Sequence, residues 1–284
     1  GDRVWTYGDI IYEYVGEDRL DSVVLGVEDY TNQDLWRVVN TIQVTAIEAA
    51  TIDAISAAAS LAVSGGFVSV SVSAAGAGAT NVILTDTNAY VDSSTLISEG
   101  DVAITADNTA KIDAAVLTAS AAASVGGVAV GASLGISVAR NFIGYDIWGV
   151  NDAAEVQAYV TNSSTIKALG DIALAATSDA TVDAEVFAGS VAFTGGVVAV
   201  SVSGAGASVT NKVSTDVEAY VYNSTITGPQ TSGARAGDVS LTAHDTSTIN
   251  AIVGAASVAG SVGYIGASVS IGVSVASNTI ANNV

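Results

Sequence analysis

Four nearly uncharged runs of alternating small and apolar residues dominate the pattern of this chain. They occupy residues 52–81, 112–141, 182–211 and 249–278, and three of them have a Gly-Gly pair near the middle. Their β-branched residues favour strands over helix even though Ala is abundant. Each run is therefore predicted to form two long strands that meet at the central glycines, such as Gly126 and Gly127.

The four runs belong to a longer repeat. They start at Ile52, Ile112, Val182 and Ile249, which is 60, 70 and 67 residues apart, and a short alternating stretch precedes each of them. The connectors carry AYV and a Ser/Thr-rich turn at residues 89, 158 and 219. Copies of fixed length joined by variable connectors indicate stacked units. The sequence predicts an all-β, parallel β-solenoid (β-helix-like) over residues 41–284, with repeats at about 41–99, 100–169, 170–236 and 237–284.

Both faces of the long strands are apolar or small. Ile112, Ala114 and Val116 alternate with Ala115 and Leu117, a pattern typical of strands covered on both sides. A membrane span has the required length, but the central glycines and recurring Ser would drive insertion only weakly. A membrane partner is therefore not favoured.

Residues 1–40 differ from the rest and are predicted to form a small separate β module. VWTYGDIIYEYVG alternates around Gly-Asp as a β-hairpin does, and residues 32–39 fit either one short helical turn or a third strand. The module is rich in aromatic residues, which form either its core or a platform that stacks on sugar rings. These candidate glycan-binding residues are Trp5, Tyr7, Tyr12, Tyr14, Tyr30 and Trp36.

The amino-acid composition argues against some classes of partner and binding site. The formal net charge of −20, from 8 basic and 28 acidic residues, argues against a nucleic-acid partner. The absence of Cys removes disulfides and the usual zinc sites. The chain also contains no Met, so we expect it to be a segment of a longer protein, whose signal peptide would not be visible here.

Several positions coincide when the four copies are superposed, and they predict structural ladders. Stacked coils lie about 4.8 Å apart, so an Asn at a turn can bond to its copies above and below. The predicted ladder residues are Asn81, Asn141, Asn211 and Asn278, with Ser60, Ser120, Ser190 and Ser257.

Asp53, Asp113, Asp183 and Asn250 coincide in the same way. Carboxylates at that spacing repel one another by about 1 kcal/mol in water, so they either face solvent or share a cation. Calcium would suit their oxygen ligands, although no EF-hand or GGxGxD motif is present. Solvated charge is the preferred interpretation, and no other cofactor is expected.

No catalytic residues are predicted, and the chain is not expected to be an enzyme. His244 is the single histidine and aligns with Ile47, Asp107 and Thr177, so no repeated chemistry depends on it. A Ser-His-Asp arrangement would rest on this one ring. The glycine-rich stretches at residues 76 and 204 lie within strands, which excludes a phosphate loop.

AYV-x-NSTI, then GD-[VI]-x-[LI]-x-A, then the Gly-Gly-centred run ending in Asn resemble repeats of very large bacterial surface proteins, the filamentous-haemagglutinin-like and leukotoxin-family filamentous adhesins. The opening YGDIIYEYVG also looks like a module interspersed among such repeats. This resemblance implies secretion, a bacterial cell-surface location and a β-solenoid stalk or fibre used in adhesion. It supplies no catalytic residues.

Two functions follow from these observations, and a third is less favoured. The first is a structural stalk segment, and the second is a carbohydrate-binding adhesin whose specificity lies in residues 1–40. A depolymerase on a β-helix would need an acidic cleft that the pattern does not show. For the stalk, we expect end-to-end self-association through unsatisfied terminal strands, while the charge of −20 opposes side-by-side bundling.

Overall fold

The computed structural model describes residues 3–5, 11–16, 28–30, 32, 35–39, 41–98, 100–168, 170–227 and 237–284. All regular elements within these ranges are strands. Beyond the first three strands they stack in parallel, coil upon coil, which confirms the all-β, parallel β-solenoid.

Each sequence repeat forms one coil. The first coil runs through β4 (Ile42–Glu48), β5 (Thr51–Ile83), β6 (Thr87–Asp92) and β7 (Thr95–Ser98). The second comprises β8 (Val102–Asn108), β9 (Lys111–Ile143), β10 (Ala154–Thr161) and β11 (Thr165–Ala168). The third comprises β12 (Ile172–Ser178), β13 (Thr181–Val213), β14 (Thr215–Val221) and β15 (Thr225–Thr227), and the fourth β16 (Val239–Asp245) and β17 (Thr248–Ile280).

Equivalent residues of successive coils pair directly. Ile52 pairs with Ile112, Ile112 with Val182, and Val182 with Ile249. The sheet orders β17-β13-β9-β5 and β16-β12-β8-β4 follow the same stacking. The variable connector lengths therefore leave the register unchanged.

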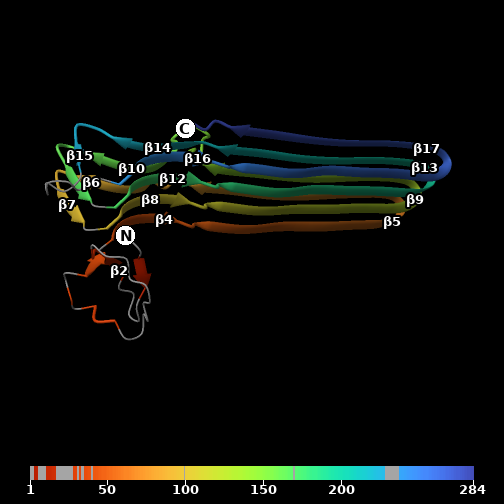
Figure 1. The fold of residues 1–284 in the computed structure, drawn as a ribbon. Helices are drawn as coiled ribbons and strands as arrows, with labels where there is room; N and C mark the ends of the chain where they lie inside the picture. Colours follow the sequence, from red (N-terminus) through yellow and green to blue (C-terminus); the bar gives the residue numbers. More distant parts are fainter. Residues whose placement is uncertain are drawn as a thin grey trace.

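The molecule divides into a body and a long flat extension, which we call the blade. The body contains the short strands of the coils, and the blade consists of β5, β9, β13 and β17, each of which runs outward, bends at its central glycines and returns (Figure 1). We call the two parts of each long strand the outbound half and the return half. About 15 residues per half, at about 3.3 Å each, give the blade a length of about 50 Å.

The two halves of a long strand face each other through side chains. The described backbone pairings of the long strands join neighbouring coils, whereas Ser60 and Ser73 of β5 meet across the blade with their hydroxyls 2.7 Å apart. The blade is therefore two stacked parallel sheets. The sequence correctly placed the bend at the glycines, but the two strands that meet there are not a hydrogen-bonded hairpin.

The interior becomes thinner from the body to the blade tip. Ile104, Val156 and Leu174 belong to the core of the body, and Val116 and Val186 continue it into the near part of the blade. Farther out the buried side chains are small, including Ser133 and Ser203. The prediction of two covered faces is wrong for the blade, because its outer faces leave large apolar side chains exposed.

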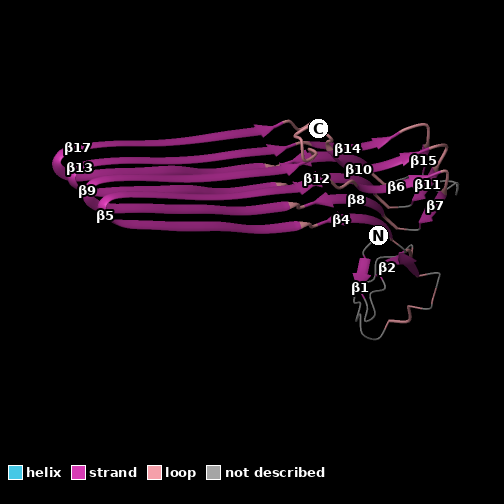
Figure 2. Cartoon of the chain, turned by 180° about the vertical axis from the view of Figure 1, so that it is seen from behind, coloured by secondary structure: helices cyan, strands magenta, loops and turns pink. Residues whose placement is uncertain are grey.

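The first strands form a separate small sheet. β1 (Arg3–Trp5) pairs antiparallel with β2 (Ile11–Tyr14), and β2 pairs antiparallel with β3 (Trp36–Val39). The hairpin is confirmed, and residues 36–39 form a third strand. This sheet lies beside the body and away from the blade tip (Figure 2).

Candidate functional site

The predicted glycan-binding aromatics pack mainly on one another. Tyr30 lies 4.8 Å from Tyr12 and 5.0 Å from Trp36 between ring centroids, and Tyr14 lies 5.3 Å from Trp36. Only 3% of Trp36 is exposed, so its ring is core and offers no face to a sugar. Tyr7 lies outside the described residues, and the side chain of Trp5 is not among those described.

The four asparagines form a continuous hydrogen-bonded ladder at the base of the blade. Asn81 donates its side-chain N–H to the amide oxygen of Asn141 at 2.8 Å, Asn141 donates to Asn211 at 2.8 Å, and Asn211 donates to Asn278 at 2.9 Å. Asn141 and Asn211 are completely buried. The ladder lies within the long strands near their ends rather than at a turn.

The aligned serines make a different contact from the one expected. Ser60, Ser120, Ser190 and Ser257 are in register, but each contacts a serine 13 residues later in the same coil, with oxygens 2.7–2.8 Å apart. These hydroxyls therefore join the two sheets of the blade. The serine ladder along the stack is corrected to a row of cross-blade pairs.

The acidic row lies on the outer side of the outbound halves. Lys111 lies 2.9 Å from Asp113 and 3.8 Å from Asp183, and Asn250 donates to Asp183 at 2.8 Å. The hydrogen bond and the charge of Asp113 raise the pKa of Lys111.

These contacts give Asp113 a lysine partner and give Asp183 a lysine and an asparagine partner. Within the described ranges, no group of three or more His, Cys, Asp or Glu is placed to hold a metal ion. The calcium alternative for Asp53, Asp113 and Asp183 stays a prediction.

Sequence reasoning missed a set of polar caps at the corner between the body and the blade. Glu48 accepts the backbone N–H of Ala50 at 2.8 Å, Asn108 that of Ala110 at 2.9 Å, and Asp245 that of Ser247 at 2.9 Å. Each capping residue is the last residue of the short strand that opens its coil, and it accepts the N–H of the residue two positions later. That recurrent placement was the available signal.

At the same corner, hydrogen bonds stabilise the partly buried carboxylate of Asp245. Burial alone would raise the pKa of Asp245, but hydrogen bonds from Thr215, Ser247 and Asn282 outweigh it and hold the pKa below its usual value. Thr215 and Asn282 donate at 2.5 and 2.7 Å. The carboxylate at the end of β16 thus joins the start of β14 in the third coil to the residues on either side of β17.

A tyrosine ladder on the body, formed by the AYV motifs of the connectors, was also missed. Tyr159 stacks on Tyr90 and on Tyr220 with centroids 5.2 and 5.1 Å apart and planes inclined by 9° and 2°. Burial is the main cause that raises the pKa of Tyr159 and Tyr220. The three rings stack face to face, so the tyrosine of the AYV motif contributes to the packing between coils.

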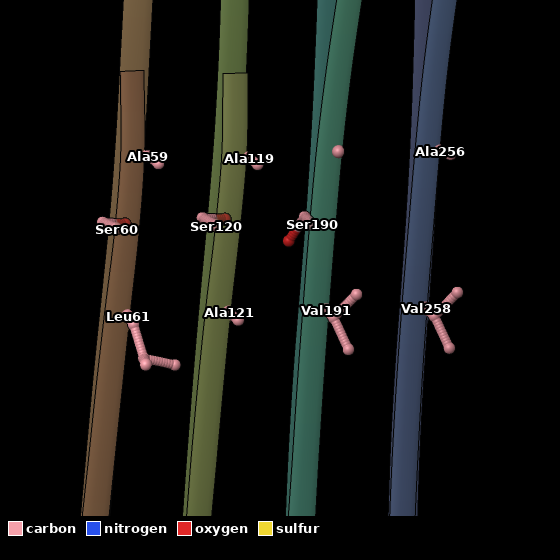
Figure 3. A pocket seen from close by; sticks show the side chains of 11 residues that line it. Ala59, Ser60, Leu61, Ala119, Ser120, Ala121, Ser190, Val191, Ala256 and Val258 are labelled. Atoms are coloured by element: carbon pink, nitrogen blue, oxygen red, sulfur yellow. The ribbon is translucent and has the colours of Figure 1, made fainter. Parts of the chain in front are cut away.

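The outer side of the outbound halves also carries a shallow apolar groove of about 500 Å³. Ala59, Ala119 and Ala256 line it, and Leu61, Val191 and Val258 lie along one side (Figure 3). It crosses all four long strands. No polar side chain suited to catalysis lines it apart from serines engaged across the blade.

His244 is exposed and pairs through its backbone position with Thr177. No family model, curated protein or solved structure matches this chain. The described ranges contain no helix with the length and apolar character needed to cross a membrane.

Proposed function

We propose that this chain is a structural segment of a giant secreted bacterial surface protein. In this role it forms part of an extracellular stalk or fibre used in adhesion or cell-cell contact. The observation that carries the proposal is the open-ended stack: β5 and β17, each 33 residues long, are the outer strands of the blade sheet. Their backbone groups offer a template for another coil.

The residues after β17 continue the fourth coil along β14. The N–H groups of Ala281 and Asn283 donate to the carbonyls of Val213 and Thr215, both at 2.9 Å. An added strand in this register would continue along β14, beside the tyrosine ladder. The resemblance to adhesin repeats supports the surface location, whereas the buried Trp36 gives the sugar-binding alternative no support.

The asparagine ladder provides a specific test of end-to-end growth. Asn278 accepts from Asn211, and its own N–H group faces the end where a further coil would stack. Asn278→Asp keeps an acceptor for Asn211 but cannot donate onward. We expect wild-type protein to lengthen as ionic strength rises toward about 0.15 M, where charges are screened beyond about 8 Å, and the variant to stay short.

Electron microscopy and light scattering across a salt series measure this difference. Ser277→Asp is the matched control, because it adds the same charge at the adjacent position outside the ladder and should still lengthen. Wild-type protein that is monomeric at every salt concentration contradicts the proposal.

A further inference from the structure

The outer side of the return halves is a regular surface of β-branched residues, which we call the valine face. Near the tip it consists of three rows across the four strands, one residue per coil. These rows are Val68, Val128, Val198 and Ile265; Val70, Val130, Val200 and Ala267; and Val72, Ala132, Val202 and Val269. Val72, for example, is 68% exposed.

The inner side of the same strands has the opposite character. Ser69, Ser71 and Ser201 are buried there, and their hydroxyls have no hydrogen-bond partner. Small polar side chains therefore occupy the interior while the valines remain outside. Hydrophobic stabilisation is proportional to the apolar area removed from water. Most of the hydrophobic stabilisation available to the return halves therefore requires another surface to cover the valine face.

The charged residues of the blade do not oppose binding of another surface to the valine face. All charged residues of the four long strands lie within the first five or last four residues of a strand, and β17 has none. On the outer side of the return halves these are Arg140 and Lys212, both at the base. The charged side chains of the long strands are thus remote from the valine rows.

We propose that the valine face pairs with the valine face of a second copy of this chain. Without the row of Arg140, the return halves have six outward rows about 6.6 Å apart across four strands about 4.8 Å apart, which gives a face of about 33 by 19 Å. Two such faces bury about 1,250 Å², at the lower end of the range of stable protein interfaces. The same patch on both partners makes a closed, isologous dimer.

The opposite blade face and a lipid bilayer are poorer partners. The outer side of the outbound halves carries four carboxylates at its base, Asp53, Asp113, Asp183 and Glu185, whereas that of the return halves carries only Arg140 and Lys212. Pairing two outbound faces therefore brings more like charge together. A bilayer would leave the backbone groups along the open edges of β5 and β17 without partners, at a cost of several kcal/mol each. A second valine face meets neither obstacle.

Paired aspartate substitutions test the proposal. Val130 on the valine face and Val191 on the opposite face are 38% and 37% exposed, so Val130→Asp and Val191→Asp are matched. Sedimentation at low ionic strength, where end-to-end stacking is weakest, should show a wild-type dimer. Val130→Asp should raise the dimer dissociation constant at least about 30-fold, and Val191→Asp should leave it nearly unchanged.

A nitroxide reports the same contact without a destabilising charge. The chain contains no Cys, so Val200→Cys and Val191→Cys can each carry a single label. Spin–spin broadening is expected at position 200 alone. Circular dichroism checks that each variant keeps its strands.

Each other outcome overturns the proposal. A wild-type monomer shows that the face is not paired, and equal losses for both aspartate variants indicate contact between unlike faces. Cosedimentation with neutral phosphatidylcholine vesicles that Val130→Asp abolishes identifies lipid as the cover. End-to-end growth uses β5 and β17, so it stands or falls separately through Asn278→Asp.

Discussion

Replacing Gly196 by alanine should lower the free energy of unfolding by about 3 kcal/mol. A Cβ at Gly196 would overlap the carbonyl oxygen of Gly126 in the coil below, and Gly126 and Gly263 stand in the same relation to their own lower neighbours. That oxygen belongs to the backbone at the blade tip and cannot move without disturbing the stacked turn. Glycine is required here because the coils approach so closely.

Gly206→Ala is the control for this variant. Gly206 lies on the return half of the same strand, and a Cβ built there meets nothing within 4 Å. Urea unfolding followed by circular dichroism should show little loss for Gly206→Ala, with an effect within about 1 kcal/mol of wild type. Equal destabilisation of the two variants contradicts the close stacking of the tip turns.

Asn141→Leu should cost about 2 to 5 kcal/mol. The substitution leaves the donor of Asn81 and the acceptor of Asn211 without their partner, and each buried polar group left unpaired costs about 1 to 3 kcal/mol. Asn278 makes a single ladder bond, with Asn211, so Asn278→Leu should cost about half as much. Urea unfolding of the variants measures both losses.

His244→Ala provides the baseline for the ladder. His244 is exposed, and its replacement should change stability by less than about 0.5 kcal/mol. Comparable losses for Asn141→Leu and His244→Ala would mean that the asparagines do not hold the coils together. A cost for Asn278→Leu equal to that for Asn141→Leu would show that the loss of stability does not follow the number of ladder hydrogen bonds broken.

Repeat spacing made the stacking predictable. The equal distance from each opening strand to its closing Asn places Asn81, Asn141 and Asn211 at one height in successive coils, and the structure pairs the same residues. Glycines at the centre of each run likewise marked the bend. These features depend on chain length and backbone geometry, which sequence periodicity records directly.

The direction in which the blade side chains point was not predictable in the same way. Rows such as Val70 and Ser71 alternate, but alternation alone does not say which row faces inward. The usual preference for buried valine gives the wrong answer near the tip, because the two sheets there enclose small side chains such as Ala129, Thr194 and Ser201. Only the packing of the two halves reveals that serine lies inside.

Features made by several coils together also escaped detection. Tyr90, Tyr159 and Tyr220 occur once per connector, and their stacking needs the register of β6, β10 and β14. The sequence of the first 40 residues fits an aromatic core as well as an exposed aromatic platform for sugar rings. Burial of Trp36 distinguishes the two, and burial depends on contacts that periodicity does not encode.

The distance between the first and last coils tests most directly that each repeat is one coil of an in-register stack. Gln43 pairs with Ala103, Ala103 with Ala173, and Ala173 with Ser240, so spin labels on Gln43→Cys/Ser240→Cys are three steps apart. Pulsed and continuous-wave electron paramagnetic resonance should place their backbones about 14 Å apart. Four independently folded repeats, each more than about 20 Å across, would instead give a broad distribution extending beyond about 40 Å, and that result would contradict the account.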